Sequence, residues 1–190
     1  MHDSREDRAP ADGVNASDMI ASFDKRRSAS TPRKHDVMRI TSVQSELDLE
    51  VIHRFLCEES TWARGIPRPL LERAIEHSLC FGGFIGKHQV AFARVVTDRA
   101  TFANLVDVFV LTDYRGRGFA KEILRAVMAH SDLQGLRRFT LATGDAHNLY
   151  RRFGFGPPSQ PQSLMERYVP EIYLHASSVP VSSSNAATGA

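Results

Sequence analysis

The sequence predicts one α+β domain in which helices flank a central β-sheet. Its 190 residues include 42% apolar side chains, which is enough for one buried core and too little for two. Runs that alternate as strands do are interleaved with runs that have helical spacing. Two glycine turns divide these runs. Gly86-Lys-His88 separates two strand-like runs, and Arg115-Gly-Arg-Gly-Phe-Ala120 separates a strand-like run from a helix-like run.

The two ends of the chain do not have the composition of a packed fold. Residues 1–36 are rich in Asp, Arg, Ser, Ala and Pro and have no apolar period, and residues 176–190 are a low-complexity run. We therefore expect a disordered leader over 1–36, a folded domain over 37–175 and a disordered tail over 176–190. The basic stretch Lys25-Arg-Arg27 leaves open a targeting patch or a regulatory serine site in the leader.

The first half of the expected domain contains a strand, two helices and a hairpin. We expect the first strand over residues 38–43. Apolar residues then recur at helical spacing, with Ser45 and Asp48 as candidate N-caps. A second helix begins at Pro67-Arg-Pro69, because the first turn of a helix tolerates proline. The hairpin strands are expected over residues 78–85 and 89–97.

The second half alternates strands and helices. The expected elements are a strand over 102–111, a helix over 121–130, a strand over 138–142, a short helix over 145–153 and a last strand over 166–173. The apolar side chains of the first of these helices form one stripe, which consists of Phe119, Ile123, Val127 and Met128. The complete predicted order is β-α-α-β-β-β-α-β-α-β.

Charge and cysteine content exclude several classes of function. The net charge of +2 gives no general attraction for nucleic acid or an anionic membrane. No apolar run has the length of a membrane span, and acidic residues near the start argue against a transit peptide. Cys57 and Cys80 lack metal-ligand spacing and suit a reducing compartment. We therefore expect a cytoplasmic protein with no metal, nucleic-acid or membrane partner.

The turn from Arg115 to Ala120 has the properties of an anion-binding cradle. A strand that turns into a helix leaves backbone N–H groups without intrahelical partners, and the helix dipole adds positive charge there. Gly118 and Ala120 lack bulk, so phosphate oxygens can approach the main chain, and Arg115 and Arg117 add charge at the rim. A P-loop would end in Gly-Lys-Ser/Thr, and a dinucleotide fingerprint would need a small residue where Lys121 stands, so neither fits.

Two motifs in this half resemble the GNAT superfamily of acetyl-CoA-dependent N-acetyltransferases. Arg115, Gly118 and Ala120 match the fixed positions of its Gln/Arg-x-x-Gly-x-Gly/Ala signature. Downstream, Ala146-His-Asn-Leu-Tyr-Arg-Arg-Phe-Gly-Phe155 is similar to its A-x-x-L-Y-x-x-x-G-F segment. The predicted element order is also that of the GNAT fold. The resemblance implies a mixed, mostly antiparallel twisted sheet flanked by helices, and an acyltransferase that uses acetyl-CoA and releases CoA.

The resemblance also implies where the cofactor binds. The family splays the strand before the turn from its neighbour after a bulge, so the strand's backbone binds pantetheine, here at Phe109, Val110 and Leu111. The backbone of the turn is expected to bind the pyrophosphate, at Arg115, Gly116, Arg117, Gly118, Phe119 and Ala120. Many family members have a cofactor-binding Asn where this chain has Thr143, and the candidate replacements are Asp145, His147 and Asn148.

Tyr150 is the first candidate for proton transfer. In the family, the tyrosine that matches it lies beside the departing sulfur, to which its phenol can donate a proton. The alternative is a core tyrosine that packs beside Phe153 and Phe155. His147 lies one helical turn from Tyr150 and is a candidate base.

Asp107 is the second candidate base, because it is an ionisable residue in an otherwise apolar strand. Strand alternation predicts that its side chain shares a face with Leu105 and Phe109. It either deprotonates the incoming amine or forms an ion pair with an arginine such as Arg94.

Trp62 is the candidate residue for the acceptor. It lies in the helix–loop–helix segment that the family uses as an acceptor wall, although it could instead cap the core. The segment around Tyr150 resembles bacterial small-molecule acetyltransferases, which favours a small amine that attacks directly in a ternary complex, and homodimers are common in the family. The alternatives are a non-catalytic CoA-binding or interaction module and a nucleotide-binding domain of another type.

Overall fold

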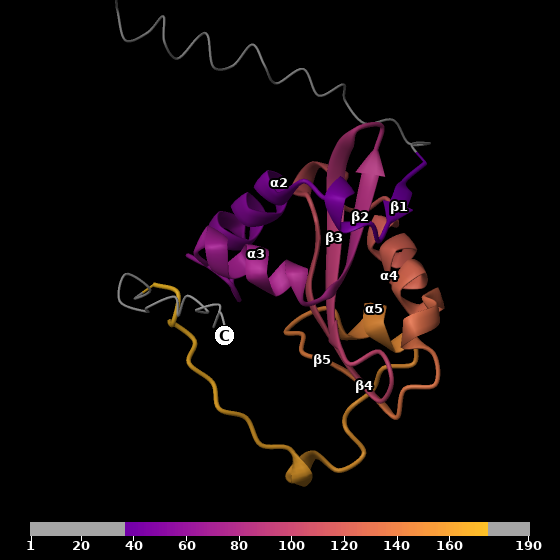
Figure 1. The fold of residues 1–190 in the computed structure, drawn as a ribbon. Helices are drawn as coiled ribbons and strands as arrows, with labels where there is room; N and C mark the ends of the chain where they lie inside the picture. The colour runs from indigo at the N-terminus through magenta and orange to yellow at the C-terminus, as the bar shows by residue number, and fades with distance from the viewer. Residues whose placement is uncertain (1–36, 175–190) are drawn as a thin grey trace, which may run out of the picture. The chain divides into compact units, whose positions relative to one another are not determined.

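The computed structural model describes residues 37–174, which lie within one compact unit spanning residues 34–190. Its centre is a five-stranded sheet in the order β1-β2-β3-β4-β5 (Figure 1). The first three pairings are antiparallel and the pairing of β4 with β5 is parallel, which confirms the predicted sheet. The strands are β1 (Arg39–Thr41), β2 (Leu79–Ile85), β3 (His88–Thr97), β4 (Phe102–Val110) and β5 (Arg138–Leu141).

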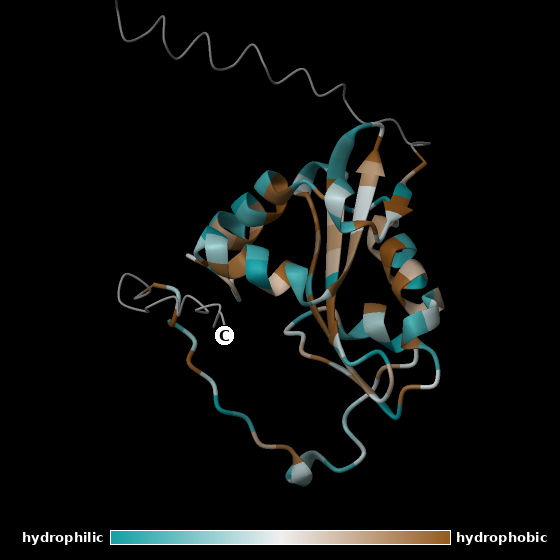
Figure 2. Cartoon of the chain, viewed as in Figure 1, coloured by the Kyte–Doolittle hydropathy of each residue, from teal (hydrophilic) through white to brown (hydrophobic). Residues whose placement is uncertain are grey.

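Helices cover both faces of this sheet (Figure 1). The helices α2 (Leu49–Arg54) and α3 (Arg68–Glu76) lie on one face, with a π-helical stretch, Phe55–Glu59, after α2. The helix α4 (Phe119–Ala129) lies on the other face, together with the short helix α5 (His147–Arg151). Their apolar sides turn toward the sheet (Figure 2), because burial of apolar surface drives the packing. Two apolar clusters result, one on each face of the sheet.

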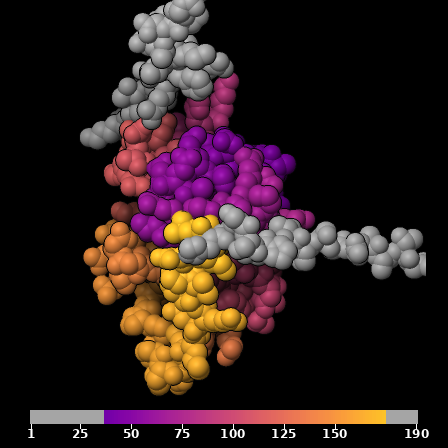
Figure 3. Space-filling model, turned by 90° about the vertical axis from the view of Figure 1, so that its left-hand side faces the viewer, coloured from indigo at the N-terminus to yellow at the C-terminus, as the bar shows by residue number. Residues whose placement is uncertain are grey.

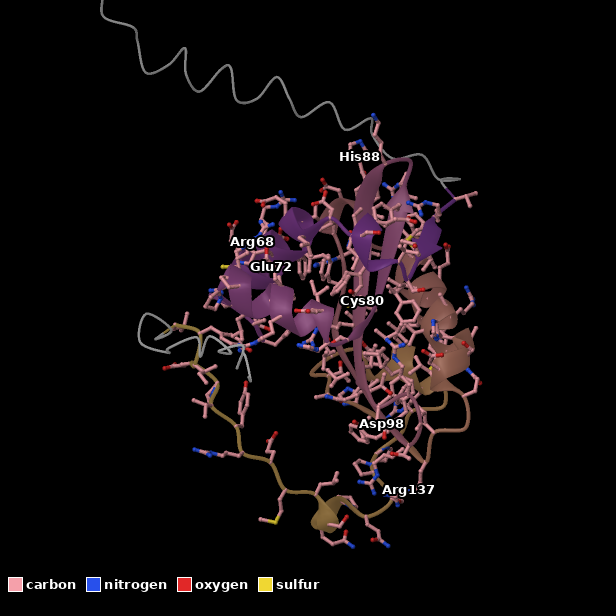
Figure 4. The ribbon with its side chains drawn as sticks, in the orientation of Figure 1. Arg68, Glu72, Cys80, His88, Asp98 and Arg137 are labelled. Atoms are coloured by element: carbon pink, nitrogen blue, oxygen red, sulfur yellow. The ribbon has the colours of Figure 1, made fainter. Side chains whose placement is uncertain are left out.

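Local chemistry explains how the helices begin. The Asp48 carboxylate accepts the N–H groups of Glu50 and Val51, so Asp48 caps α2, and the other candidate cap, Ser45, does not. Pro67 precedes α3 as expected. Arg68 forms an ion pair with Glu72 one turn later on α3, and these two side chains lie together in Figure 4.

The buried stripe of α4 differs from the prediction by one residue. Phe119, Ile123 and Val127 are buried as expected, but Leu124 is buried with them and Met128 is only partly buried. A helix turns about 100° per residue, so Leu124 and Met128 both border the stripe. Leu124 lies about 40° nearer than Met128 to the middle of the stripe, so Leu124 is the one that is fully buried.

A β-bulge in β4 changes which side chains face which cluster. Phe109 pairs with Phe92, whereas Val106 pairs with Arg94. Asp107 and Val108 therefore oppose the single residue Ala93 of β3. Asp107 accordingly has a positive φ of 52°. The prediction that Leu105 and Phe109 share a face is therefore wrong. Leu105 packs in the cluster under α4, and Phe109 packs in the cluster under α2 and α3.

The predicted last strand over 166–173 is not formed. The segment after α5 contains a short 3-10 helix, Pro161–Ser163, and continues without strand pairing to Leu174. Pro170 lies in its middle and has no N–H to donate to a ladder. The expected leader, 1–36, and tail, 176–190, lie outside the described residues. Between residues 37 and 174, no helix is both long enough and apolar enough to cross a bilayer.

Candidate active site

The turn between β4 and α4 forms an open cradle of backbone amides. Gly118 is the N-cap of α4 with φ of 93°, and Gly116 has φ of 76°, a conformation that glycine adopts without strain. A Cβ added to either glycine would meet nothing within 4 Å. Within residues 37–174, no acceptor bonds the N–H groups of Gly116, Gly118, Phe119 or Ala120. These amides border a cavity of about 320 Å³ that also reaches Val110 and Leu149.

The two arginines of the turn brace it from the side. The Nε atom of Arg115 donates a 3.0 Å hydrogen bond to the carbonyl of Val110. Arg117 donates to the carbonyl of Asp113, at 3.2 Å, and its guanidinium lies 5.5 Å from the ring centre of Tyr114. Their side chains therefore fix the path of the turn, and the anion site itself consists of backbone groups.

β4 and β5 separate just before this turn. Their parallel pairing ends at Leu105 and Leu141, whereas β4 stays paired with β3 as far as Val110. The Leu111 N–H donates to the carbonyl of Val90, so alternation turns the backbone of Val110 away from β3 and toward the opening. The predicted splay is thus present.

The three predicted pantetheine positions differ in the direction of their backbone groups. The N–H of Leu111 donates to Val90 and its carbonyl accepts from Tyr114, so the backbone of Leu111 is already used. By the same alternation the backbone N–H and carbonyl of Phe109 point toward β3. The Phe109 ring stacks on the Phe55 ring, with 3.9 Å between the ring centres. Among the three, only Val110 turns its backbone to the opening. Alternation gives the backbone of Val108, directly after the bulge, the same direction as that of Val110. Val108 was not predicted, because the resemblance implies a bulge without its position.

Tyr150 lies in α5 with its ring buried and 9% of the residue exposed. Burial and, secondarily, the charge of Asp145 raise the pKa of the Tyr150 phenol, so it keeps its proton at neutral pH. No group in the described part of the chain bonds its hydroxyl. The ring packs edge-on against Phe155. Tyr150 and His147 line one cavity of about 450 Å³, so these two predicted residues are brought together.

The other polar residues around α5 have local partners. The Thr143 hydroxyl accepts the N–H of Ala146 at 3.0 Å and so stabilises the start of α5. The Asn148 side-chain oxygen accepts from Arg151 at 3.1 Å. Asn148 therefore lies on the exposed side of α5, and its predicted contact with the cofactor stays a prediction.

Trp62 and Asp107 meet on the face of the sheet that carries α2 and α3. The indole N–H of Trp62 donates to one carboxylate oxygen of Asp107 at 3.1 Å, and Arg94 donates to the other at 2.7 Å. Arg94 also donates to the Ser78 hydroxyl at 3.0 Å. The side chains of Arg94 and Asp107 are 16% and 9% exposed, so this ion pair is well shielded from water. The expected alternative, a pairing of Asp107 with Arg94, is confirmed.

Cys80, which is labelled in Figure 4, lies on β2 and pairs across the strands with Arg94 of this ion pair. Burial raises the pKa of its thiol to about 12, so the thiol is not a nucleophile at neutral pH. Ser78 and Val108 are the site residues that sequence reasoning missed, since neither has a motif around it. In the described ranges no three His, Cys, Asp or Glu side chains gather in a way that could hold a metal ion.

Comparisons with known proteins agree with this geometry. The sequence profile of the acetyltransferase (GNAT) family matches residues 49–155. A Gibberella zeae protein provisionally named as an acetyltransferase is 29% identical over 126 residues, which cover 55% of this chain and 70% of that protein. A crystal structure from Xanthomonas campestris, described as a GNAT-family protein, is 60% identical with a TM-score of 0.71 and covers 72% of this chain and 96% of its own.

A more distant structure shows the same fold. Glucosamine-6-phosphate N-acetyltransferase from Arabidopsis thaliana is 15% identical with a TM-score of 0.51, over 70% of this chain and 98% of its own. The motifs, the sheet order, the amide cradle and the family match thus lead to one assignment: the chain belongs to the GNAT family and is an acetyltransferase.

Proposed function

We propose that this protein transfers an acetyl group from acetyl-CoA to the amine of a small molecule, by direct attack in a ternary complex. The observation that carries the proposal is the cradle, in which four neighbouring backbone N–H groups have no acceptor in the described residues. Amides at a helix N-terminus that lack partners are suited to a pyrophosphate. The cradle opens beside the separated ends of β4 and β5, where a long cofactor arm has room.

The residues present fit acetyl-CoA. Gly116, Gly118, Phe119 and Ala120 would hold the pyrophosphate, and the backbone of Val108 and Val110 would bind the arm. Acetyl-CoA supplies an acetyl group on a thioester, whose carbonyl is open to attack by an amine. The Val110 carbonyl is already bonded to Arg115, so its N–H is the group that remains for the cofactor.

Tyr150 has the properties of the general acid. Its hydroxyl has no protein partner in the described chain. Its raised pKa keeps the phenol protonated, so the proton can be donated to the departing thiolate. A positioned proton donor of this kind contributes about 10²–10⁴-fold in rate.

We assign Asp107 a positioning role and give the proton-accepting role to His147, acting through water. Both oxygens of Asp107 already accept charge-assisted or neutral hydrogen bonds, from Arg94 and Trp62. These two bonds hold the carboxylate in place, and Arg94 already balances its charge. His147 lines the cavity of Tyr150 and has no protein partner in the described residues.

Trp62 supports an amine acceptor. The residue is 48% exposed and its indole N–H is held by Asp107, so Trp62 offers a fixed aromatic surface. Such a surface attracts an ammonium group before the group loses its proton. Because homodimers are common in the GNAT family, we include a homodimer in the proposal.

The test has two stages. In the first, thermal unfolding is followed with acetyl-CoA, CoA, ATP or NAD; acetyl-CoA at about 100 times its Kd should stabilise by about 2.7 kcal/mol, and ATP and NAD should not. In the second, release of free thiol is followed with panels of small amines and with lysine-containing peptides. Turnover with small amines supports the proposal. Binding without thiol release on any panel would indicate a non-catalytic module, and turnover with peptides alone would refute the small acceptor.

A further inference from the structure

We propose that the acceptor is an α-amino acid with an apolar side chain, bound through its carboxylate by Arg94 and through its amine by Asp107 and Trp62. This inference rests on the proposed function, because it names the class of small amine that the same site accepts. The evidence comes from the face of the sheet that carries α2 and α3, where Arg94 of β3 lies beside the bulge of β4.

The guanidinium of Arg94 is held in place by two neighbours and keeps one nitrogen for a ligand. Its Nε atom donates to Asp107 at 2.7 Å, and its Nη1 atom donates to the Ser78 hydroxyl at 3.0 Å. That hydroxyl in turn donates to the carbonyl of Ala74 at 2.6 Å, so it is fixed as an acceptor for Arg94. No acceptor among residues 37–174 bonds the third nitrogen, Nη2, and this nitrogen is not sealed from solvent. A guanidinium that is already fixed in position loses little freedom when it binds a carboxylate.

The carboxylate of Asp107 has room for an ammonium group. An ionised carboxylate offers about four lone-pair positions, and Asp107 uses two of them to accept from Trp62 and Arg94. The ring of Trp62 lies beside it and attracts an ammonium group as well. Asp107 and Arg94 thus present a negative and a positive group side by side. Since an α-amino acid carries its ammonium and its carboxylate on one carbon atom, each of its charges meets an opposite charge at the same time.

The order of the strands gives the amino acid one orientation. Asp107 belongs to β4, whose backbone after the bulge is proposed to bind the cofactor arm, and β4 separates from β5 at this level. Arg94 belongs to β3, which is one strand farther from β5. An amino acid bound between the two residues therefore turns its amine toward the thioester and its carboxylate away from it. This is the orientation that acetyl transfer to the amine needs.

An apolar strip, formed by Val96, Phe102 and Val106, continues from Arg94 along the same face. Val106 pairs directly with Arg94. Val96 pairs with Asn104, and alternation puts Phe102 on this face too. Figure 3 looks onto α2 and α3 (indigo to purple), with the last described residues (yellow) beneath them. Val96 and Phe102 are each 41% exposed, so neither part of the chain covers the strip, and an apolar side chain of the acceptor gains by packing on it.

Binding to the complex with CoA tests this inference separately from turnover. Isothermal titration of the CoA-saturated protein compares leucine with isopentylamine and phenylalanine with phenethylamine, because the members of each pair differ only in the carboxylate. Each amino acid should bind at least about tenfold more tightly than its amine. Glycine, which has no side chain for the strip, should bind at least about tenfold more weakly than leucine. Equal affinities within the pairs, or glycine as tight as leucine, would overturn the proposal.

Substitution of Arg94 should remove the preference for amino acids. In Arg94→Gln, leucine and isopentylamine should bind with about the same affinity. The double variant Arg94→Gln, Asp107→Asn leaves no buried charge without a partner, so it answers the same question if the single variant does not fold. Arg68→Gln is the matched control, because Arg68 also forms ion pairs but lies on the exposed side of α3. A preference for leucine that survives in both Arg94 variants would refute the assignment.

Thiol release with the same compounds then reports on the proposed function by itself. Turnover of leucine and phenylalanine, with a KM that rises at least about tenfold in Arg94→Gln, supports both proposals. Turnover of the simple amines without any preference in binding would keep acetyl transfer and refute the amino-acid acceptor. Preferential binding of amino acids without thiol release would support the amino-acid site and refute the transfer.

Discussion

The indole N–H of Trp62 donates a 3.1 Å hydrogen bond to Asp107, although the two residues are 45 positions apart. One belongs to the loop between the first two helices and the other to the bulge of β4. The second oxygen of the carboxylate is held by Arg94 of β3. The wall proposed for the acceptor is thus bonded to the strand proposed for the cofactor.

Substitution of Asp107 should separate positioning from proton transfer. Asp107→Asn and Trp62→Phe should both raise the KM for the acceptor, because each loosens the same hydrogen bond, while kcat falls less than about tenfold. The acid limb of the pH–rate profile should stay in place in both variants. Loss of that limb in Asp107→Asn alone, with kcat reduced by about 10² or more, would make Asp107 the base. Asp107→Ala should lower the free energy of unfolding by about 3 kcal/mol, since it leaves Arg94 largely buried without its carboxylate.

Gly118→Asp should abolish binding of acetyl-CoA without unfolding the domain. The substitution places a carboxylate in the cradle and a non-glycine residue at φ of 93°, which costs about 1–2 kcal/mol. Gly135→Asp is the control, because Gly135 also has a positive φ, of 71°, and open space around its Cβ position, but lies away from the cradle. Both variants should melt at similarly lowered temperatures, and only Gly118→Asp should lose the shift with acetyl-CoA. An equal loss in both would mean that strain, and not charge in the cradle, weakens binding.

Tyr150→Phe should lower kcat at least about tenfold and leave the KM for the acceptor nearly unchanged. The ring and its edge-on contact with Phe155 remain, so the melting temperature should change little. Tyr173→Phe removes a hydroxyl elsewhere and should leave kcat as in the parent protein. Full kcat in Tyr150→Phe would show that water or His147 delivers the proton.

The turn at Asp98 should make the domain sensitive to acid. Hydrogen bonds from the Thr101 hydroxyl and then from the N–H groups of Phe102, Thr101 and Ala100 lower the pKa of the Asp98 carboxyl. Since the folded state has the lower pKa, its stabilising effect is complete above the unfolded value of 3.8 and is lost as the pH falls below it. Melting curves of the parent and Asp98→Ala should therefore differ most above about pH 5, and the difference should shrink steadily as the pH falls below about 3.8 toward the lowered pKa. A difference that does not shrink in acid would attribute it to the turn geometry alone.

The sheet and its helices could be predicted because their signals are local. Alternation locates β2 and β3, and the glycine turn before Phe119 locates both the cradle and the start of α4. The cradle is made of backbone groups, so a short motif suffices to identify it. The pairing of Trp62 with Asp107 depends on the complete fold, and no local pattern encodes it.

Two errors have physical causes outside the local sequence. The resemblance implied a bulge but not its position, because a positive φ is usually found at glycine, and here Asp107 adopts it while paired with Arg94. The strand over 166–173 was predicted from its apolar alternation alone. Alternation shows which side chains a strand could bury, but a strand also needs an unpaired sheet edge that it can reach. Pro157, Pro158 and Pro161 keep the preceding linker extended, so residues 166–173 do not reach such an edge.

The bulge also gives β4 one residue that the two cores do not need. A deletion of Asp107 would leave a regular ladder with β3, in which Phe109 still faces α2 and α3 and Val110 still faces α4. The deletion would remove only the carboxylate that holds Trp62 and Arg94. The extra residue therefore adds a polar side chain to the face of the sheet under α2 and α3 without altering the packing of either core.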